Sequence, residues 1–247
     1  MFLFTLYHQL AKQKTSVSKS FSDPETWPDS WKTTYIKVYE RFPLISLPEV
    51  TKEIHKDVQS SLIEVLTTRK TKRSFGKSLT PQVISDLLYY SIGVRKDLLD
   101  TGEEHRMYPS GGSRYPLEFY LIFFKPVGEI SEGVYHYDIE SHGLRMLRDT
   151  KVDSASLSEE MGYYFLEYAS CAIISTASFS RVSEKYKEGA YKLILLEAGG
   201  AMQNLSLVSS LLHVDSVNIG ALAEHVIEPL LDIDGTEESC VHSMFFG

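Results

Sequence analysis

The sequence predicts an α+β fold, because segments patterned as buried strands alternate with segments of helical spacing. Residues 119–124 are a continuous apolar and aromatic run, which is typical of a buried strand. Residues 133–138 and 144–148 predict a hairpin whose turn is at residues 141–143. Residues 185–212 predict one long helix, and its apolar side chains surround nearly the whole circumference. We therefore expect this helix to be enclosed on most sides.

The other elements follow from local signals. Thr80-Pro81 predicts a helix start, with the hydroxyl residue as N-cap, and Gly93 ends that helix. The remaining expected elements are a helix from Pro48 to about Thr68, a helix from Leu157 to Tyr168, a strand over 172–176, a strand over 215–222, a helix over 224–231 and a last strand over 241–247. Residues 1–50, broken by several prolines, are expected to form an arm packed on the core or on a partner subunit, and residues 51–247 the main domain.

Composition excludes several classes of function. The chain of 247 residues is 43% hydrophobic and carries a net charge of −8, which argues against a general nucleic-acid binder. Cys171 and Cys240 have no metal-type or redox spacing and suggest free thiols in a reducing compartment. The apolar start lacks the basic region of a signal peptide, and no long stretch is free of strongly polar residues. A cytoplasmic protein without membrane contact is expected.

Two polar segments are candidates for ligand binding. Residues 109–116 read Pro-Ser-Gly-Gly-Ser-Arg-Tyr-Pro, so a flat ligand could lie directly against a backbone without side chains at Gly111 and Gly112. An ordinary turn before the next strand is the alternative. Residues 69–75 hold four cations in five positions with hydroxyls among them, which suits a phosphate. A solvated basic end of a helix is the alternative there.

Other site patterns are missing from the sequence. There is no P-loop, no dinucleotide-binding Gly-x-Gly-x-x-Gly after a strand and no hydrolase Gly-x-Ser-x-Gly. The histidines form no helical pair, so no metal site is expected. Gly199 and Gly200 inside the long helix are costly unless another backbone or a flat ligand comes close. These features together suit a flat, phosphorylated cofactor.

Five motifs, in order along residues 65–247, resemble the SagB-type branch of the nitroreductase superfamily. The first two are Arg69-Lys-Thr-Lys-Arg-Ser-Phe75 and Pro109-Ser-Gly-Gly-Ser-Arg-Tyr-Pro-Leu-Glu118. The others are Gly133-Val-Tyr-His-Tyr-Asp138, Lys185-Tyr186 with Ala190-Tyr191, and Leu196-Glu-Ala-Gly199 with Gln203-Asn204-Leu205. The resemblance implies a nitroreductase-like fold, with a mostly antiparallel sheet flanked by helices and a long buried central helix, as a homodimer. It also implies FMN at the subunit interface.

The resemblance further assigns residues to the cofactor. The phosphate and ribityl side would be held by Arg69, Thr71 and Arg73. The ring side would be formed by Pro109, Ser110, Gly111, Gly112 and Ser113. Gln203 would lie close to the cofactor, and Gly220 would put backbone near the reactive flavin nitrogen.

The same branch contains dehydrogenases that oxidise thiazoline or oxazoline rings, made by a partner cyclodehydratase, to aromatic azoles. The resemblance assigns the proton transfer to Lys185 and Tyr186, with the neighbouring ammonium lowering the tyrosine pKa. The residues alone favour a surface Lys-Tyr at a helix start, and the resemblance reverses that interpretation. Two other functions remain open: an NAD(P)H-dependent nitro or quinone reductase, and a non-catalytic scaffold subunit of a peptide-modifying complex.

Overall fold

A seven-stranded sheet forms the centre of the protein, in the order β1-β4-β3-β2-β5-β7-β6. The computed structural model describes residues 7, 24–32, 36–52, 62–76, 78–95, 105–220 and 222–247. All neighbouring strands in the sheet run antiparallel. The strands are β1 (Leu44–Ser46), β2 (Leu117–Phe123), β3 (Gly133–Asp138), β4 (Gly143–Arg148), β5 (Cys171–Ser178), β6 (Ser216–Ile219) and β7 (Glu238–Phe246). The predicted α+β class and antiparallel sheet are confirmed.

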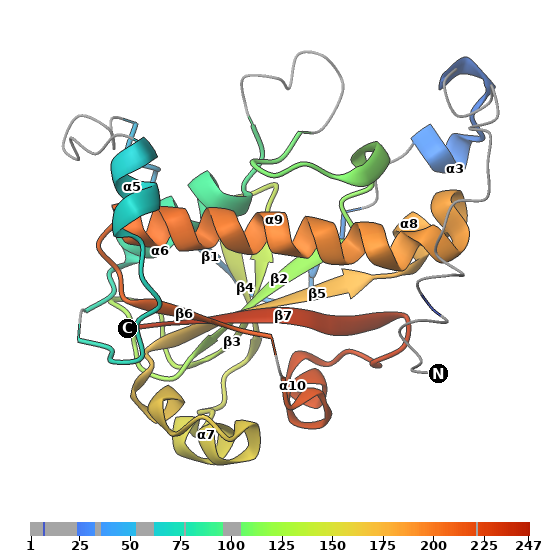
Figure 1. Ribbon diagram of the computed structural model, residues 1–247. Helices are drawn as coiled ribbons and strands as arrows, with labels where there is room; N and C mark the ends of the chain where they lie inside the picture. The colour runs from blue at the N-terminus through green and yellow to red at the C-terminus, as the bar shows by residue number, and fades with distance from the viewer. Residues whose placement is uncertain are drawn as a thin grey trace.

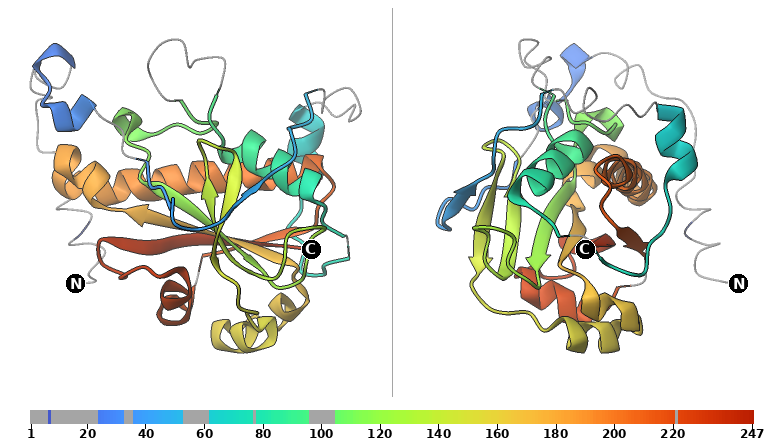
Figure 2. Two further views of the ribbon diagram at one scale, coloured as in Figure 1. Left: turned by 180° about the vertical axis from the view of Figure 1, so that it is seen from behind. Right: turned by 90° about the vertical axis from the view of Figure 1, so that its left-hand side faces the viewer.

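Helices cover both faces of this sheet, as the two views at right angles show (Figures 1 and 2). On one face lie α6 (Pro81–Ile92) and α9 (Ala190–Leu211), and on the other α7 (Ser154–Met161) and α10 (Glu224–Leu231). The shorter helical elements are η1 (Pro24–Thr26), α3 (Asp29–Lys32), α5 (Leu62–Thr68), η3 (Gly111–Ser113), η4 (Tyr164–Tyr168), α8 (Ser180–Tyr186) and η5 (Lys187–Gly189). Each face of the sheet therefore has its own apolar core.

The local signals at the start of α6 are confirmed. The Thr80 hydroxyl accepts a hydrogen bond from the Val83 amide at 3.2 Å, and Pro81 occupies the first turn, where its missing amide costs nothing. The predicted hairpin is confirmed as well, because β3 and β4 pair and residues 139–142 form the turn between them. Cys171 and Cys240 are free thiols, as predicted.

Two predicted helices are wrong in extent. The helix expected over Leu157 to Tyr168 is divided: α7 ends at Gly162, which takes the left-handed conformation with φ 70°, and η4 follows. The long helix expected from Lys185 begins only at Ala190. Lys187 has φ 49°, which no right-handed helix tolerates, so α8 stops and η5 turns the chain into α9.

The N-terminal segment contributes β1, which pairs with β4 at an edge of the sheet. Two further expectations need correction. Residues 48–52 are not helical, and α5 begins at Leu62; residues 53–61 of the predicted helix lie outside the described part. The long helix is not enclosed on most sides, because Tyr191, Leu195 and Leu196 are 44%, 43% and 66% exposed.

Candidate functional site

The glycine-bearing loop at residues 109–113 is attached to α9 by hydrogen bonds. The Ser110 hydroxyl donates to the Glu197 carboxylate at 2.6 Å and accepts from the Tyr115 amide at 2.8 Å. About two turns further along α9, the Asn204 side chain donates to the Met107 carbonyl at 2.8 Å. Loop and helix are therefore joined by one side chain to side chain and one side chain to backbone hydrogen bond, neither of which uses the glycines at the loop tip.

Two glycines form the tip of this loop. Gly111 packs against the Leu193 side chain, and a Cβ at this position would lie 3.4 Å from it. Gly112 has φ +66°, and a Cβ there would lie 2.5 Å from the Tyr186 hydroxyl and 3.3 Å from the Lys185 amine. Only glycine meets both the conformation and the space. The structure thus brings the predicted loop and the predicted Lys-Tyr pair into direct contact.

Lys185 and Tyr186 occupy the last turn of α8. The Lys185 side chain is only 4% exposed, and its amine lies 3.3 Å from the centroid of the Trp27 ring. Burial lowers the pKa of Lys185, and the positive charge of Arg114 lowers it further. Burial raises the pKa of Tyr186, with Arg114 opposing the shift. The expected lowering of the tyrosine pKa is therefore wrong for this chain, because desolvation outweighs the nearby positive charge.

Glu197 is a buried carboxyl group that the sequence analysis placed in a motif without giving it a role. Burial raises its pKa to about 7, against the hydrogen bond from Ser110 and the charges of Arg106 and Arg181. One of its oxygens, Oε1, is buried and has no hydrogen-bond partner. The sequence signal for this residue was a lone acidic side chain in an apolar helix. A glutamate is almost never fully buried unless it is paired, and buried carboxyl groups with shifted pKa values are common at functional sites.

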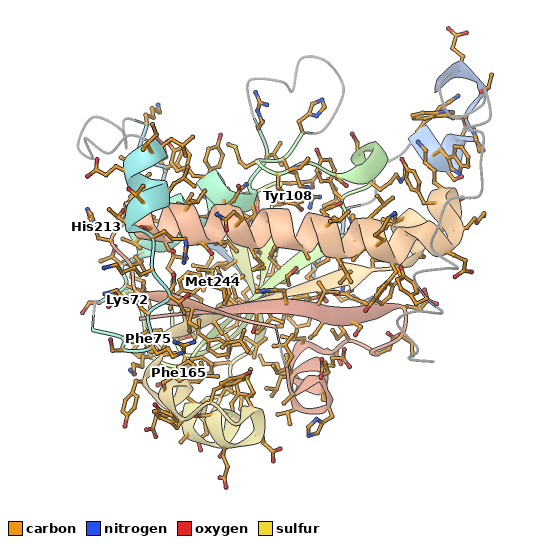
Figure 3. The ribbon with its side chains drawn as sticks, viewed as in Figure 1. Lys72, Phe75, Tyr108, Phe165, His213 and Met244 are labelled. Atoms are coloured by element: carbon orange, nitrogen blue, oxygen red, sulfur yellow. The ribbon has the colours of Figure 1, made fainter. Side chains whose placement is uncertain are left out.

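The basic segment, residues 69–73, lies at the far end of α9. Lys72 is anchored by its backbone amide to the Ser216 carbonyl at 2.9 Å, and its amine lies 3.6 Å from the Asp215 carboxylate. Arg73 lies over the Phe165 ring, 5.8 Å from the centroid. Figure 3 shows Lys72 and His213 at this end and Tyr108 nearer the middle of α9. A cleft of about 260 Å³ opens here, lined by Glu64, Val65, Thr68, Lys70, Lys72, Ser210, Leu211, His213, Val214 and Asp215.

The predicted phosphate ligands and Gly220 face solvent to different degrees. Thr71 and Arg73 are exposed and Arg69 is half-buried. Gly220 is exposed at the end of β6, and a Cβ there would meet nothing within 4 Å. None of these residues contacts the 109–113 loop within one chain.

Gln203 and the glycines Gly199 and Gly200 lie between the two ends of α9. Gln203 is exposed on α9, one turn after Gly200. A Cβ on Gly200 would lie 4.0 Å from Pro109, and one on Gly199 would meet nothing. The described part of the chain therefore gives no steric reason for glycine at either position.

The length of α9 separates the two candidate halves of the site. Leu193 packs against the loop tip and Ser210 lines the cleft by the basic segment. At 1.5 Å per residue these two positions are about 26 Å apart along the helix axis. The 109–113 loop and the basic segment therefore lie at opposite ends of α9.

The nitroreductase family profile matches residues 66–247, which is most of the chain. The chain belongs to the nitroreductase family. Among curated relatives, MJ1384 of Methanocaldococcus jannaschii, itself named for a nitroreductase, is 28% identical over 76% of this chain and 89% of its own length. The microcin B17-processing protein McbC of Escherichia coli is 27% identical over 60% of this chain. This nitroreductase-family chain spans 56% of the length of McbC.

Solved structures share the fold of this nitroreductase-family protein. The E. coli microcin synthetase McbBCD complex with truncated pro-MccB17 superposes with a TM-score of 0.62, at 20% identity over 99% of this chain and 91% of that chain. A nitroreductase from Desulfovibrio desulfuricans, solved in complex with FMN, gives a TM-score of 0.51 at 16% identity, over 76% of this chain and 86% of that chain. The predicted nitroreductase-like fold is confirmed.

Two kinds of feature were not found among the described residues. No helix among them has the length and apolar character needed to cross a lipid bilayer. No group of three or more His, Cys, Asp or Glu side chains in the described ranges is arranged to hold a metal ion.

Proposed function

We propose that the protein is an FMN-dependent dehydrogenase of the SagB type, which oxidises a thiazoline or oxazoline ring of a peptide or carrier-bound substrate to the azole. The observation that carries the proposal is the packing of Lys185 and Tyr186 against Gly112. This contact brings the two side chains proposed to transfer the proton beside the backbone of Gly112, which has no side chain of its own. The relationship to McbC, named for microcin B17 processing, supports a peptide substrate.

The residues present fit FMN. Gly111 and Gly112 offer bare backbone to the ring, and the cationic segment beginning at Arg69 offers charged donors to the phosphate. The phosphate side would use Arg69, Thr71 and Arg73. The ring side would use Pro109, Ser110, Gly111, Gly112 and Ser113, with Gln203 and Gly220 nearby.

Aromatisation of an azoline breaks two C–H bonds on adjacent ring carbons and forms one C=C bond. A proton and a hydride leave the ring. Bound FMN would supply the hydride acceptor. The proton goes to the Lys185–Tyr186 pair. Lys185 is the better base of the two, because burial and the nearby charge of Arg114 lower its pKa, whereas the pKa of Tyr186 is raised. Tyr186, whose pKa is raised, stays protonated and can donate a hydrogen bond.

The proposal includes a homodimer, because the two halves of the site lie at opposite ends of α9. The face of α5 and α9 that would join two copies carries exposed large apolar side chains: Leu62, Ile63, Leu66, Tyr191, Leu195 and Leu196. Such a face is costly in water. If a second α9 packs here in the opposite direction, each basic segment meets the loop of the other copy. A cyclodehydratase that forms the azoline is the corresponding partner, and a cytoplasmic location belongs to the same proposal.

Complementation between inactive variants tests the two-chain site. Arg69→Met/Arg73→Met removes the phosphate half, and Lys185→Met/Tyr186→Phe removes the ring half. Each variant alone should be inactive. An equal mixture that exchanges subunits should recover roughly a quarter of wild-type activity, since half of the dimers hold one intact site of two. A mixture that stays inactive although mixed dimers form would contradict the two-chain site. Lys187→Met, an exposed neighbour of the pair, is the matched control.

A second candidate function is an NAD(P)H-dependent nitro or quinone reductase. It is favoured by the coverage of the relatives, because this chain spans 89% of MJ1384 but 56% of McbC. Anaerobic bleaching of the flavin band separates the two functions. Rapid bleaching by an azoline peptide, with none by NAD(P)H, is the result expected for the dehydrogenase. The reverse result would assign the reductase. Full activity of the Lys185→Met/Tyr186→Phe variant in an assembled complex would instead indicate a scaffold subunit.

A further inference from the structure

A short aromatic segment, residues 24–32, lies over the end of α8 that carries Lys185 (Figures 1 and 2). It comprises η1, Trp27, Pro28 and α3. The Lys185 amine is 3.3 Å from the centroid of the Trp27 ring and 5.3 Å from that of Trp31. With Lys185 only 4% exposed, the candidate base faces an indole and not solvent. We call residues 24–32 the aromatic cover.

One buried arginine joins the cover to the main domain. Arg114 donates to the Trp31 carbonyl at 2.7 Å, to the Ser30 carbonyl at 2.9 Å and to the Arg181 carbonyl of α8 at 3.1 Å. Arg114 follows directly after the loop 109–113, so the cover is tied to the same loop that contacts the Lys-Tyr pair. Its position over Lys185 is therefore set by residues of the site.

The closed cover also carries a cost. The Trp27 indole nitrogen is buried and has no hydrogen-bond partner, and a buried unsatisfied donor costs about 1–3 kcal/mol. Opening the cover would return this N–H to water. Besides the Arg114 hydrogen bonds, the contact of the Lys185 amine, while it is protonated, with the indole face holds the cover closed, and a ring of another molecule could replace that contact.

We propose that the Trp27 indole holds the place of the substrate ring over Lys185, and that the azoline-bearing peptide displaces it; this inference rests on the proposed function. The hydrogens lost on aromatisation are on tetrahedral ring carbons and project from the two ring faces. A ring lying where the indole lies turns one face, and hence one such hydrogen, toward the Lys185 amine. The second hydrogen would leave as hydride, for which bound FMN would supply the acceptor. The occupant of this place is thus a planar five-membered ring.

Steady-state kinetics of the FMN-loaded enzyme with an azoline peptide test the proposal. The apparent affinity for the peptide is proportional to the fraction of enzyme molecules whose cover is open. Because Trp27→Ala removes the ring that must be displaced, it should lower KM by about three- to tenfold and leave kcat within about twofold. Trp27→Phe keeps a smaller ring, so its KM should lie between those of the wild type and Trp27→Ala. Trp31→Ala, which alters the ring farther from the amine, should change KM less. An unchanged KM, or a fall in kcat alone, would overturn the proposal, because either means that Trp27 packs on or positions Lys185.

Tryptophan fluorescence gives a readout that does not depend on turnover rates. The chain has two tryptophans and both are in the cover, so Trp31→Phe leaves Trp27 as the sole emitter. Under anaerobic conditions, excess azoline peptide should raise the acrylamide quenching constant of Trp27 at least twofold. The same peptide with unmodified Ser or Cys residues should not. If the enzyme oxidises the peptide but the acrylamide quenching constant of Trp27 does not change, Trp27 is not displaced and the proposal is wrong. A protein that oxidises no azoline peptide at all would instead refute the proposed function.

Discussion

The loop side of the candidate site and its basic side differ in how completely one chain builds them. On the loop side, Ser110, Gly112 and Lys185 are held by hydrogen bonds or close packing with α8 and α9. On the basic side, Thr71 and Arg73 are exposed. One chain therefore fixes the loop side through its own contacts and leaves most of the basic side in water.

Charge explains this difference. The loop tip is backbone and carries no net charge, so it can be packed before any ligand arrives. The basic segment holds four cations in five residues, Arg69 to Arg73, and burying them without an anion would cost far more than leaving them solvated. An anionic ligand and a second copy of the chain would remove that cost together.

The largest expected effect comes from adding one methyl group to the loop side. Gly112→Ala places a Cβ where the Tyr186 hydroxyl lies, so catalytic groups must move, and kcat should fall about 100-fold. Gly162→Ala is the matched control, because Gly162 has φ +70° and free space around it. Both variants should lose about 1–2 kcal/mol of unfolding free energy from the left-handed backbone. Equal kcat values for Gly112→Ala and Gly162→Ala would show that the 109–113 loop does not contact the active site.

The basic side should respond through affinity. Arg69→Met/Arg73→Met should weaken FMN binding by about 10- to 100-fold, because each charged hydrogen bond is worth about 1.5–3 kcal/mol and part of that is screened in exposed groups. Binding of riboflavin, which lacks the phosphate, should change little. Arg148→Met, at a distant exposed arginine, is the control. If a flavin titration shows that FMN and riboflavin lose binding affinity equally, this segment does not bind the phosphate.

Glu197 offers a pH test of the loop side. Its pKa is about 7 in the folded protein against 4.5 ordinarily, so the folded state keeps a proton that the unfolded state has lost between these values. Stability should therefore fall as pH rises from about 4.5 to 7. Glu197→Gln removes this dependence and should make the protein more stable than wild type at pH 8 by about 1–3 kcal/mol, with little difference at pH 4.

Urea unfolding at the two pH values measures the effect of Glu197→Gln. The exposed Glu159→Gln serves as the control and should show no such difference between them. If the Glu197→Gln variant and the wild type keep parallel stabilities across this range, Glu197 does not titrate in the folded protein.

The smallest effect concerns the glycines of α9. Gly200→Ala puts a Cβ 4.0 Å from Pro109, an ordinary contact, and a helical alanine is favoured over glycine by about 1 kcal/mol. The flavin-free protein should therefore gain up to about 1 kcal/mol of unfolding free energy, as should Gly199→Ala. A loss of FMN affinity in either variant, measured by flavin titration, would show that the glycine leaves room for the cofactor or the second copy. Unchanged affinity in both would leave these glycines without a role at the site.

Local chemistry made part of the structure predictable. Thr80 and Pro81 carry their capping roles in their own side chains, and residues 133–148 form a hairpin because both strands and the turn are contiguous. The close approach of other residues to the loop at 109–113 was predictable, because adjacent glycines before a buried strand leave room for it. The break at Lys187 was missed, because a lysine at φ 49° has no signal in the sequence and is imposed by packing.

The sequence by itself determined the strands from β2 to β7, the capped helix, the bare loop and the cluster of cations, since each depends on neighbours along the chain. Only the tertiary structure decided that Trp27 faces Lys185, that Glu197 is buried beneath Ser110, and that loop and basic segment lie at opposite ends of α9. These relations join residues tens of positions apart. Their geometry and pKa shifts come from desolvation and packing, which no local pattern encodes.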